Sequence, residues 1–100
     1  MNEERREEER VIRSLEVKWE GPSGAYTSRV SDISMGGCFI DTLGQVEVGE
    51  IISLSIKMPD GSWLSLRGEV AFYHPNIGFS VRFTFLTEDE VQQLSQLITA

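Results

Sequence analysis

Residue types that often carry chemistry are scarce in this chain of 100 residues. Cys38 is the only cysteine and His74 the only histidine. One cysteine excludes an internal disulfide, a Cys-x-x-Cys redox pair and a cysteine-rich zinc site. One histidine, with no second histidine, cysteine or carboxylate at metal-ligand spacing, gives no metal motif. We therefore expect neither a metal site nor a cofactor, and we interpret Cys38 as a small buried residue.

Long hydrophobic runs are also missing. The longest is the four-residue segment Val70–Tyr73, whereas a membrane-spanning helix needs about 20 apolar residues. The first residues, from Met1 to Arg6, carry charges of both signs and lead into no apolar stretch of the kind found in secretory signals. The sequence predicts a cytoplasmic location without membrane insertion.

Basic residues are few. Nine Lys and Arg against sixteen Asp and Glu give a net charge of −7, which repels nucleic acid and anionic membranes over most of the surface. Four of the nine basic residues lie within the first thirteen positions, and they are Arg5, Arg6, Arg10 and Arg13. The sequence thus describes an acidic body with an arginine-bearing N-terminal segment.

Length and composition fit one globular domain. Hydrophobic residues make up 40% and charged residues 25% of the chain, and a chain of this size buries roughly two thirds of its unfolded surface. The first thirteen residues contain only Met1, Val11 and Ile12 as apolar groups, too few to fasten a helix onto a core. We expect residues 1–13 to form a flexible arm and residues 14–100 to form one domain.

Alternation of apolar and polar residues predicts six short strands joined by short links. The first is expected to start at Leu15, and turn-forming clusters follow at Gly21–Gly24, Pro59–Ser62 and His74–Asn76. The residues expected to face inward on the last two strands are Leu64, Leu66, Val70 and Phe72, then Ile77, Phe79, Val81, Phe83 and Phe85. Trp63 and Tyr73 fall on the outward phase, where they mark either a contact surface or a face covered by a helix.

A helix is predicted to follow the strands. Thr87-Glu88-Asp89-Glu90 is a capping box, and Val91, Leu94, Leu97 and Ile98 then share one helical face. Sequential antiparallel strands with short turns favour closure, since closure removes exposed edges. The fold class is therefore all-β: a six-stranded antiparallel β-barrel with a C-terminal α-helix that covers one opening or edge.

Catalytic motifs are mostly absent. His74 sits beside Pro75 in a predicted turn and is interpreted as an exposed turn residue. A Ser-His-Asp set of Ser34, His74 and Asp32 exists on paper, but no nucleophile elbow accompanies it. The glycines follow no phosphate-loop pattern. The sequence does not predict an enzyme.

Two motifs rise above this background. The first is Arg5-Arg6-x-x-x-Arg10, directly before the first strand, and the second is Asp32-x-Ser34-x-x-Gly37, between the second and third strands. Each alone has an ordinary interpretation, as a solvated charge run or as a turn supported by side chains. Their joint occurrence, in this order and before these strands, is much harder to attribute to chance.

With both motifs the sequence resembles the PilZ domain family, bacterial receptors for the second messenger cyclic di-GMP, over essentially the whole chain. The resemblance implies the six-stranded barrel with its C-terminal helix. It also implies that Arg5, Arg6 and Arg10 hold the phosphates and guanine edges of the ligand. Asp32, Ser34 and Gly37, with Gly36 beside the last, would form the surface patch that receives a guanine and the ribose-phosphate.

The chemistry of these residue types suits that ligand. An arginine fork matches the O6 and N7 acceptors of guanine, and its plane stacks on purines. Asp32 can accept hydrogen bonds from guanine N1 and N2, or instead orient an arginine. Ser34 offers a hydroxyl to phosphate or ribose, whereas Gly36 and Gly37 leave room for close approach and permit positive φ. Three glutamates, residues 7–9, lie between Arg6 and Arg10 and are expected to weaken binding of a dianion.

The hypothesis from sequence is a receptor without enzymatic activity that binds cyclic di-GMP and signals to a downstream protein partner by conformational change. The alternative is a PilZ-like protein interaction module with little or no nucleotide binding. A third class, an oligonucleotide-binding barrel, is disfavoured by the net charge of −7 and by the inward phase expected for Phe79, Phe83 and Phe85.

Overall fold

The computed structural model describes residues 11–99 of the chain, with side chains from residue 14 onward. Six strands precede one helix along the chain. They are β1 (Val11–Gly21), β2 (Gly24–Ile33), β3 (Gly37–Asp41), β4 (Ile51–Lys57), β5 (Trp63–His74), β6 (Gly78–Phe83) and α1 (Glu88–Thr99).

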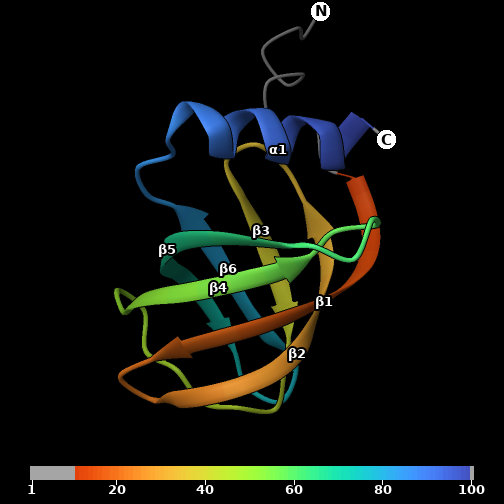
Figure 1. The fold of residues 1–100 in the computed structure, drawn as a ribbon. Helices are drawn as coiled ribbons and strands as arrows, with labels where there is room; N and C mark the ends of the chain where they lie inside the picture. The colour runs from red at the N-terminus through yellow and green to blue at the C-terminus, as the bar shows by residue number, and fades with distance from the viewer. Residues whose placement is uncertain (1–10, 100) are drawn as a thin grey trace, which may run out of the picture.

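The strands form a closed antiparallel barrel in the order β1-β2-β3-β6-β5-β4. Closure comes from β1, which pairs with β2 along one edge and with β4 along the other, the latter from Val17 opposite Ile56 to Glu20 opposite Ser53. Figure 1 shows α1 lying across one end of this barrel, where β1 begins and where the chain turns from β2 to β3. The predicted fold class, including a helix over one opening, is confirmed.

The first strand begins at Val11, four residues before the start at Leu15 that alternation predicts. Its register with β2 shifts between Ile12 and Leu15, so a bulge interrupts the alternation that marks the strand in the sequence. Residues 11–13 of the predicted arm are thus part of the barrel wall. The rest of that arm, residues 1–10, lies outside the described part of the chain.

A second bulge changes which face of β5 is buried. The register between β5 and β6 shifts between Val70 and Phe72, and one extra residue there reverses the phase of every side chain that follows. The prediction that Phe72 faces inward is therefore wrong, since 66% of Phe72 is exposed. Tyr73, expected outside, packs against the core instead, whereas Trp63 is exposed as predicted.

The expected alternation from Ile77 to Phe85 is correct only in its middle. Phe79 and Val81 are buried and Phe83 is partly buried against them. Ile77 and Phe85 are 62% and 77% exposed, because they lie just outside β6, where the pleat no longer sets the direction of side chains.

The core fills the barrel and extends under the helix. It is a single cluster of buried residues in which Trp19 and Phe79 are the largest side chains, 5.0 Å apart between ring centroids in an edge-to-face arrangement. Leu94 and Leu97 of α1 belong to the same cluster. The helix therefore closes its end of the barrel with apolar side chains.

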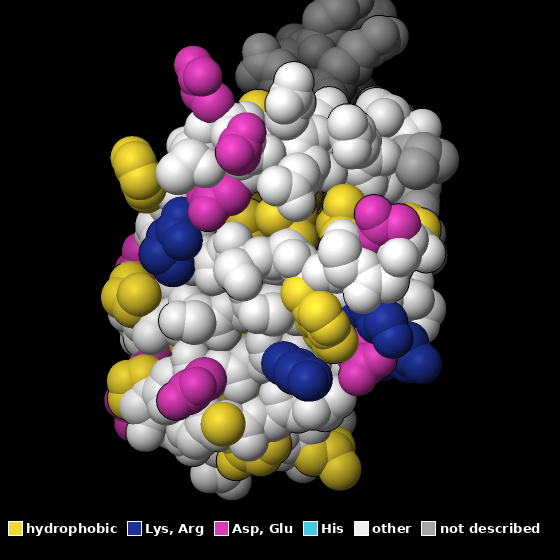
Figure 2. All heavy atoms as spheres, in the orientation of Figure 1, with side chains coloured by type: hydrophobic (Ala, Val, Ile, Leu, Met, Phe, Trp, Pro, Cys, Tyr) yellow, Lys and Arg dark blue, Asp and Glu magenta, His cyan; other side chains and the backbone are white. Residues whose placement is uncertain are grey.

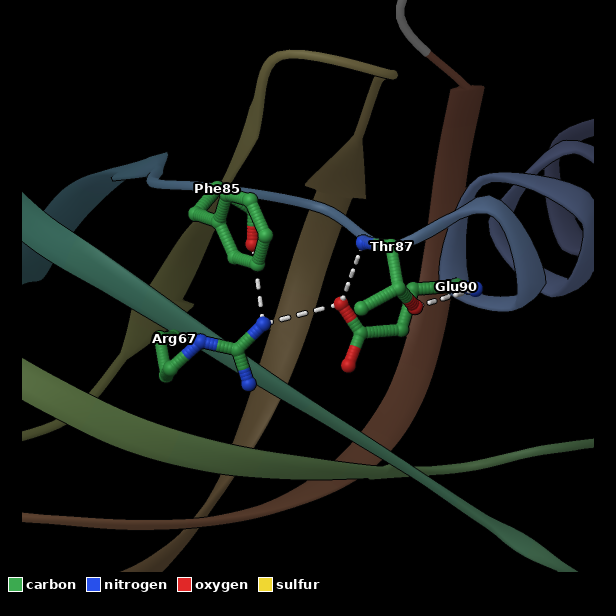
Figure 3. Close-up of polar contacts among 4 residues, drawn as sticks. All are labelled: Arg67, Phe85, Thr87 and Glu90. Carbon is green, nitrogen blue, oxygen red and sulfur yellow. Dashed lines mark hydrogen bonds and ion pairs between the residues drawn. The ribbon is translucent and has the colours of Figure 1, made fainter.

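The capping box at the start of α1 has the predicted hydrogen bonds. The Thr87 amide donates to Glu90 Oε1 at 3.0 Å, and the Glu90 amide donates to Thr87 Oγ1 at 3.2 Å. Arg67 of β5 adds a link to the barrel, because its guanidinium donates to Glu90 Oε1 at 2.9 Å and to the Phe85 carbonyl at 2.8 Å (Figure 3). One carboxylate thus joins the helix start to the barrel wall.

We expect this contact to make stability depend on pH. The Thr87 amide, followed by the Arg67 guanidinium, lowers the pKa of Glu90 below its ordinary value. A lowered pKa in the folded state gives stability that is present above the ordinary glutamate pKa and is lost as pH falls through the folded value. Glu90→Gln should cost about 0.3 to 1 kcal/mol at neutral pH, the range for a charge at a helix N-terminus.

Thermal melts of the parent and of Glu90→Gln from about pH 7 down to about pH 3 test this expectation. The difference between the two proteins should shrink as pH falls below the ordinary glutamate range. Glu88→Gln is the matched control, because the Glu88 carboxylate, also in the first turn of α1, makes no hydrogen bond or ion pair with residues 14–99. A difference for Glu90→Gln that stays constant with pH would contradict the assignment.

Candidate functional site

The strand register puts the start of β1, directly after the first motif in the sequence, beside the second motif at one end of the barrel. Val11 pairs with Ile33 and Ile12 pairs with Asp32, so the first residues of β1 lie beside the last residues of β2. The segment that carries Arg5, Arg6 and Arg10 enters the barrel at Val11. These three arginines are outside the described residues, but their point of entry is fixed beside Asp32.

Asp32 lies on the outer face of the barrel wall. It is half-buried and pairs with Ile12 on one side and with Phe39 of β3 on the other. Since side chains of directly paired residues point to the same face of a sheet, Asp32 and the half-buried Phe39 share this surface. The position agrees with the predicted surface patch.

Ser34 has a different environment from the one expected. It is fully buried, its amide donates to the Gly37 carbonyl at 2.8 Å, and its hydroxyl lies 3.4 Å from the same oxygen and accepts from the Gly36 amide at 3.2 Å. The Phe83 amide in turn donates to the Gly36 carbonyl at 2.9 Å. The hydroxyl that the sequence offered to a ligand is thus used to shape the turn and fix it to the end of β6.

Gly37 is required by the packing of two strands. A methyl group at this position would lie 2.0 Å from the Val81 carbonyl oxygen. That neighbour is backbone, so the contact is relieved only by separating β3 from β6. Neither Gly36 nor Gly37 has positive φ, so the conformational reason suggested by sequence does not apply at this turn, and close approach at Gly37 is to Val81.

We therefore expect Gly37→Ala to lower stability by at least about 1 to 3 kcal/mol, the cost of overpacking a tight contact. Urea denaturation of the variant and the parent measures the loss. Gly44→Ala is the control, because a methyl group there meets the Tyr26 ring at 3.2 Å, a side-chain neighbour that is able to move. Equal stabilities for Gly37→Ala and the parent would show that the strands separate at little cost.

Arg82 is a site residue that the sequence motifs do not single out. It pairs with Gly37 across β3 and β6 and with Glu69 across β6 and β5, and its side chain is 65% exposed, with one nitrogen 3.4 Å from Glu69 Oε1. Since its pairing partner Gly37 begins β3, Arg82 lies next to the turn between β2 and β3. Only the strand register reveals this placement, since Arg82 is far from both motifs in the sequence.

His74, the histidine of the chain, lies outside both motifs. His74 is exposed at the end of β5, with its ring centroid 6.0 Å from that of Phe39. Within residues 11–99, no three His, Cys, Asp or Glu residues are grouped so that they could hold a metal ion. No helix in the same range is long and apolar enough to cross a membrane. The notable feature is the end of the barrel where Asp32 lies beside Ile12 of β1, and where Gly37 and Arg82 pair on the next two strands, β3 and β6.

Comparison with known proteins identifies the family. The model of the PilZ domain matches residues 4–100. The chain belongs to the PilZ domain family. Members of this family are known as receptors for cyclic di-GMP that act on effectors, and not as enzymes.

Solved PilZ structures share the fold. The structure of the Bacillus subtilis inhibitor of motility, MotI/DgrA, superposes with a TM-score of 0.76 at 19% sequence identity, covering 95% of this chain and 50% of that one. The PilZ domain of CeSA from a cellulose-synthesizing bacterium has a TM-score of 0.72 at 17% identity and covers 91% of this chain and 95% of that one. This PilZ chain therefore spans about half the length of the MotI/DgrA chain. No curated protein matches its sequence.

Proposed function

We propose that this PilZ domain is a cytoplasmic bacterial receptor that binds cyclic di-GMP where the segment carrying Arg5, Arg6 and Arg10 meets Asp32. The observation that carries the proposal is the pairing of Val11 with Ile33 and of Ile12 with Asp32. This register puts Val11, the residue that follows the arginine segment, at the end of β2 that carries Asp32, and so supports a site built from both motifs.

The residues suit distinct parts of the ligand. Arginine forks match guanine O6 and N7 and the phosphates, whereas the Asp32 carboxylate suits the N1 and N2 donors of a guanine. The half-buried ring of Phe39 beside Asp32 offers an apolar edge to a base. Arg82, next to Gly37, adds a cation on the far side of the turn.

Ser34 and Gly37 act on this site indirectly. Their hydrogen bonds and close packing hold the turn between β2 and β3 against the end of β6, and that rigidity keeps Asp32 and Arg82 in place. Binding at the point where the arginine segment joins β1 would then change the surface at the helix end of the barrel. A downstream protein partner that recognises the changed surface would receive the signal. The similarity to an inhibitor of motility supports an output of this regulatory kind.

The alternative is a PilZ-like interaction module with little or no nucleotide binding. The burial of Ser34 and the packing of Gly37 favour it, since both residues are explained by the barrel alone. Under this alternative Asp32 has only a structural role beside the turn, and its replacement would affect stability alone. In a receptor, the same replacement would weaken binding of cyclic di-GMP.

Calorimetric titration with cyclic di-GMP, GTP and single-stranded DNA tests the proposal. Only cyclic di-GMP should bind, and Asp32→Ala should weaken its binding by about 1.5 to 3 kcal/mol, the range for hydrogen bonds that involve charged groups. The accompanying loss of stability should be at most about 1 kcal/mol, because Asp32 lies on the outer face of the wall.

Asp41→Ala is the matched control, because Asp41 ends β3 at the opposite end from Gly37 and is exposed. It should bind cyclic di-GMP as the parent does. If the parent does not bind cyclic di-GMP, the interaction module becomes the better description. If the folded fraction of Asp32→Ala binds as the parent does, Asp32 is not part of the binding site.

A further inference from the structure

The only two lysines of the chain lie over the same tryptophan. Nζ of Lys18, on β1, is 4.7 Å from the ring centroid of Trp63, and Nζ of Lys57, at the end of β4, is 5.8 Å from it. Trp63 itself starts β5 and is 38% exposed, whereas the other tryptophan, Trp19, is 1% exposed. On the face that Figure 2 presents, a hydrophobic side chain lies between Lys or Arg side chains, and an Asp or Glu side chain lies beside those on one side.

The register of three strands builds this cluster, which we call the Lys-Trp cluster (Lys18, Lys57 and Trp63). Lys57 pairs with Trp63, and Lys18 pairs with Ser55, which pairs in turn with Ser65. The two serine side chains between them are short, 3.5 Å apart at their hydroxyl oxygens. The Trp63 ring and both ammonium groups therefore project further from the barrel wall than the short polar side chains of Ser55 and Ser65.

A surface hollow of about 370 Å³ adjoins the Lys-Trp cluster, and its lining includes Lys18, Glu20, Tyr26, Thr27, Ser53 and Ser55. The hollow runs over residues of β1 and β4 next to the Lys-Trp cluster. A bound segment would thus find an aromatic ring, two cations and a depression on one continuous face.

The charges of the lysines are not neutralised within the described residues. Neither lysine has a carboxylate within ion-pair distance in residues 14–99, whereas Arg67 is paired with Glu90 and Arg82 with Glu69. A cation-π contact holds an ammonium over a ring without cancelling its charge, and the ammonium keeps donors for an anion. In a chain of net charge −7, this cluster is a local positive site.

The extent of the positive site limits its partner. Glu16 and Glu20 lie two residues to either side of Lys18 and share its outward phase on β1, so the positive surface ends within a few residues. A phosphate backbone or an anionic bilayer would extend beyond it and meet the acidic surroundings. Two or three neighbouring carboxylates on a short segment fit within it.

We propose that the Lys-Trp cluster is a docking surface for a short acidic segment of a partner protein. Carboxylates pair with Lys18 and Lys57, and the body of the segment packs on the exposed part of Trp63, a residue type that commonly anchors interfaces. The surface is on the barrel wall and shares no residue with the proposed nucleotide site, so its test needs no cyclic di-GMP.

The test is a titration of the full chain with a labelled synthetic peptide of alternating glutamate and serine, at low salt. NMR should show saturable shifts of the Trp63 indole N–H with little change at buried Trp19. The double variant Lys18→Gln/Lys57→Gln should lose about five- to tenfold in affinity. Salt of about 0.5 M should weaken binding to the parent.

Arg29→Gln is the control, because it removes one exposed cation from β2, opposite Asp41 and outside the cluster. Its affinity for the peptide should equal that of the parent, and melts should show that all variants fold. An equal loss in Arg29→Gln, the absence of saturable binding, or tighter binding of an oligothymidine of equal charge would overturn the proposal. A lysine-dependent dimer in sedimentation without peptide binding would overturn it in favour of a contact between two copies.

Discussion

Replacing Phe79 with alanine should lower the free energy of unfolding by about 3 to 5 kcal/mol, the range for deleting a buried aromatic side chain. Phe79 is fully buried, and its ring meets Trp19 edge-to-face with 5.0 Å between centroids. The backbone on either side is held, because Phe79 pairs with Ile40 and with Tyr73. The cavity left by truncation therefore has little means of collapsing. Urea denaturation of variant and parent measures the loss.

Phe72→Ala is the matched control for this prediction. It removes the same side chain from a position on the neighbouring strand that is 66% exposed, so its effect should stay within about 0.5 kcal/mol. Comparable losses for the two variants would contradict the assignment of Phe79 to the core and of Phe72 to the outer face.

These two phenylalanines show what period-2 alternation predicts and where it fails. Alternation places both inside, and it is right for Phe79 because β6 pairs regularly with β3 from Gly37 to Asp41. It is wrong for Phe72 because one extra residue in β5 reverses the phase, and nothing in the segment Val70–Tyr73 marks the bulge. The bulge near the start of β1 has the same effect on the predicted strand boundary.

Hydrogen bonds between residues close in the sequence can be predicted from residue spacing. The sequence predicts both hydrogen bonds of the capping box at Thr87 and Glu90, because only three residues separate the partners. Arg67 also binds Glu90, but it comes from a strand 23 residues earlier. No spacing rule links residues that far apart.

In the candidate site, too, the features that depend on neighbouring residues are predictable from sequence, and those that depend on a distant strand are not. The sequence predicts the second motif as a turn between two strands, and Asp32 lies on the outer wall as expected. It does not reveal that Ser34 is buried or that Gly37 is needed for the packing of β3 on β6, because both facts depend on the distant strand that carries Val81 and Phe83. The neighbour Arg82 is unpredictable for the same reason.

The arginine segment gives the largest expected effect on ligand binding. Arg6→Ala and Arg10→Ala should each weaken binding of cyclic di-GMP by at least about 1.5 to 3 kcal/mol, which is about 10- to 150-fold in affinity. The reason is that each guanidinium is expected to donate to a phosphate or to guanine O6 and N7, and alanine replaces none of these donors. Calorimetric titration of each variant measures the loss.

Stability should hardly change in these variants, because the segment before Val11 has only Met1 as an apolar side chain with which to anchor itself. Arg29→Ala provides the control, since it removes an exposed arginine from β2, opposite Asp41 and three residues before Asp32, and should bind as the parent does. An unchanged affinity in either Arg6→Ala or Arg10→Ala would refute this assignment of the site, because the register of β1 with Asp32 would then bring the arginines to the barrel end without a role in binding.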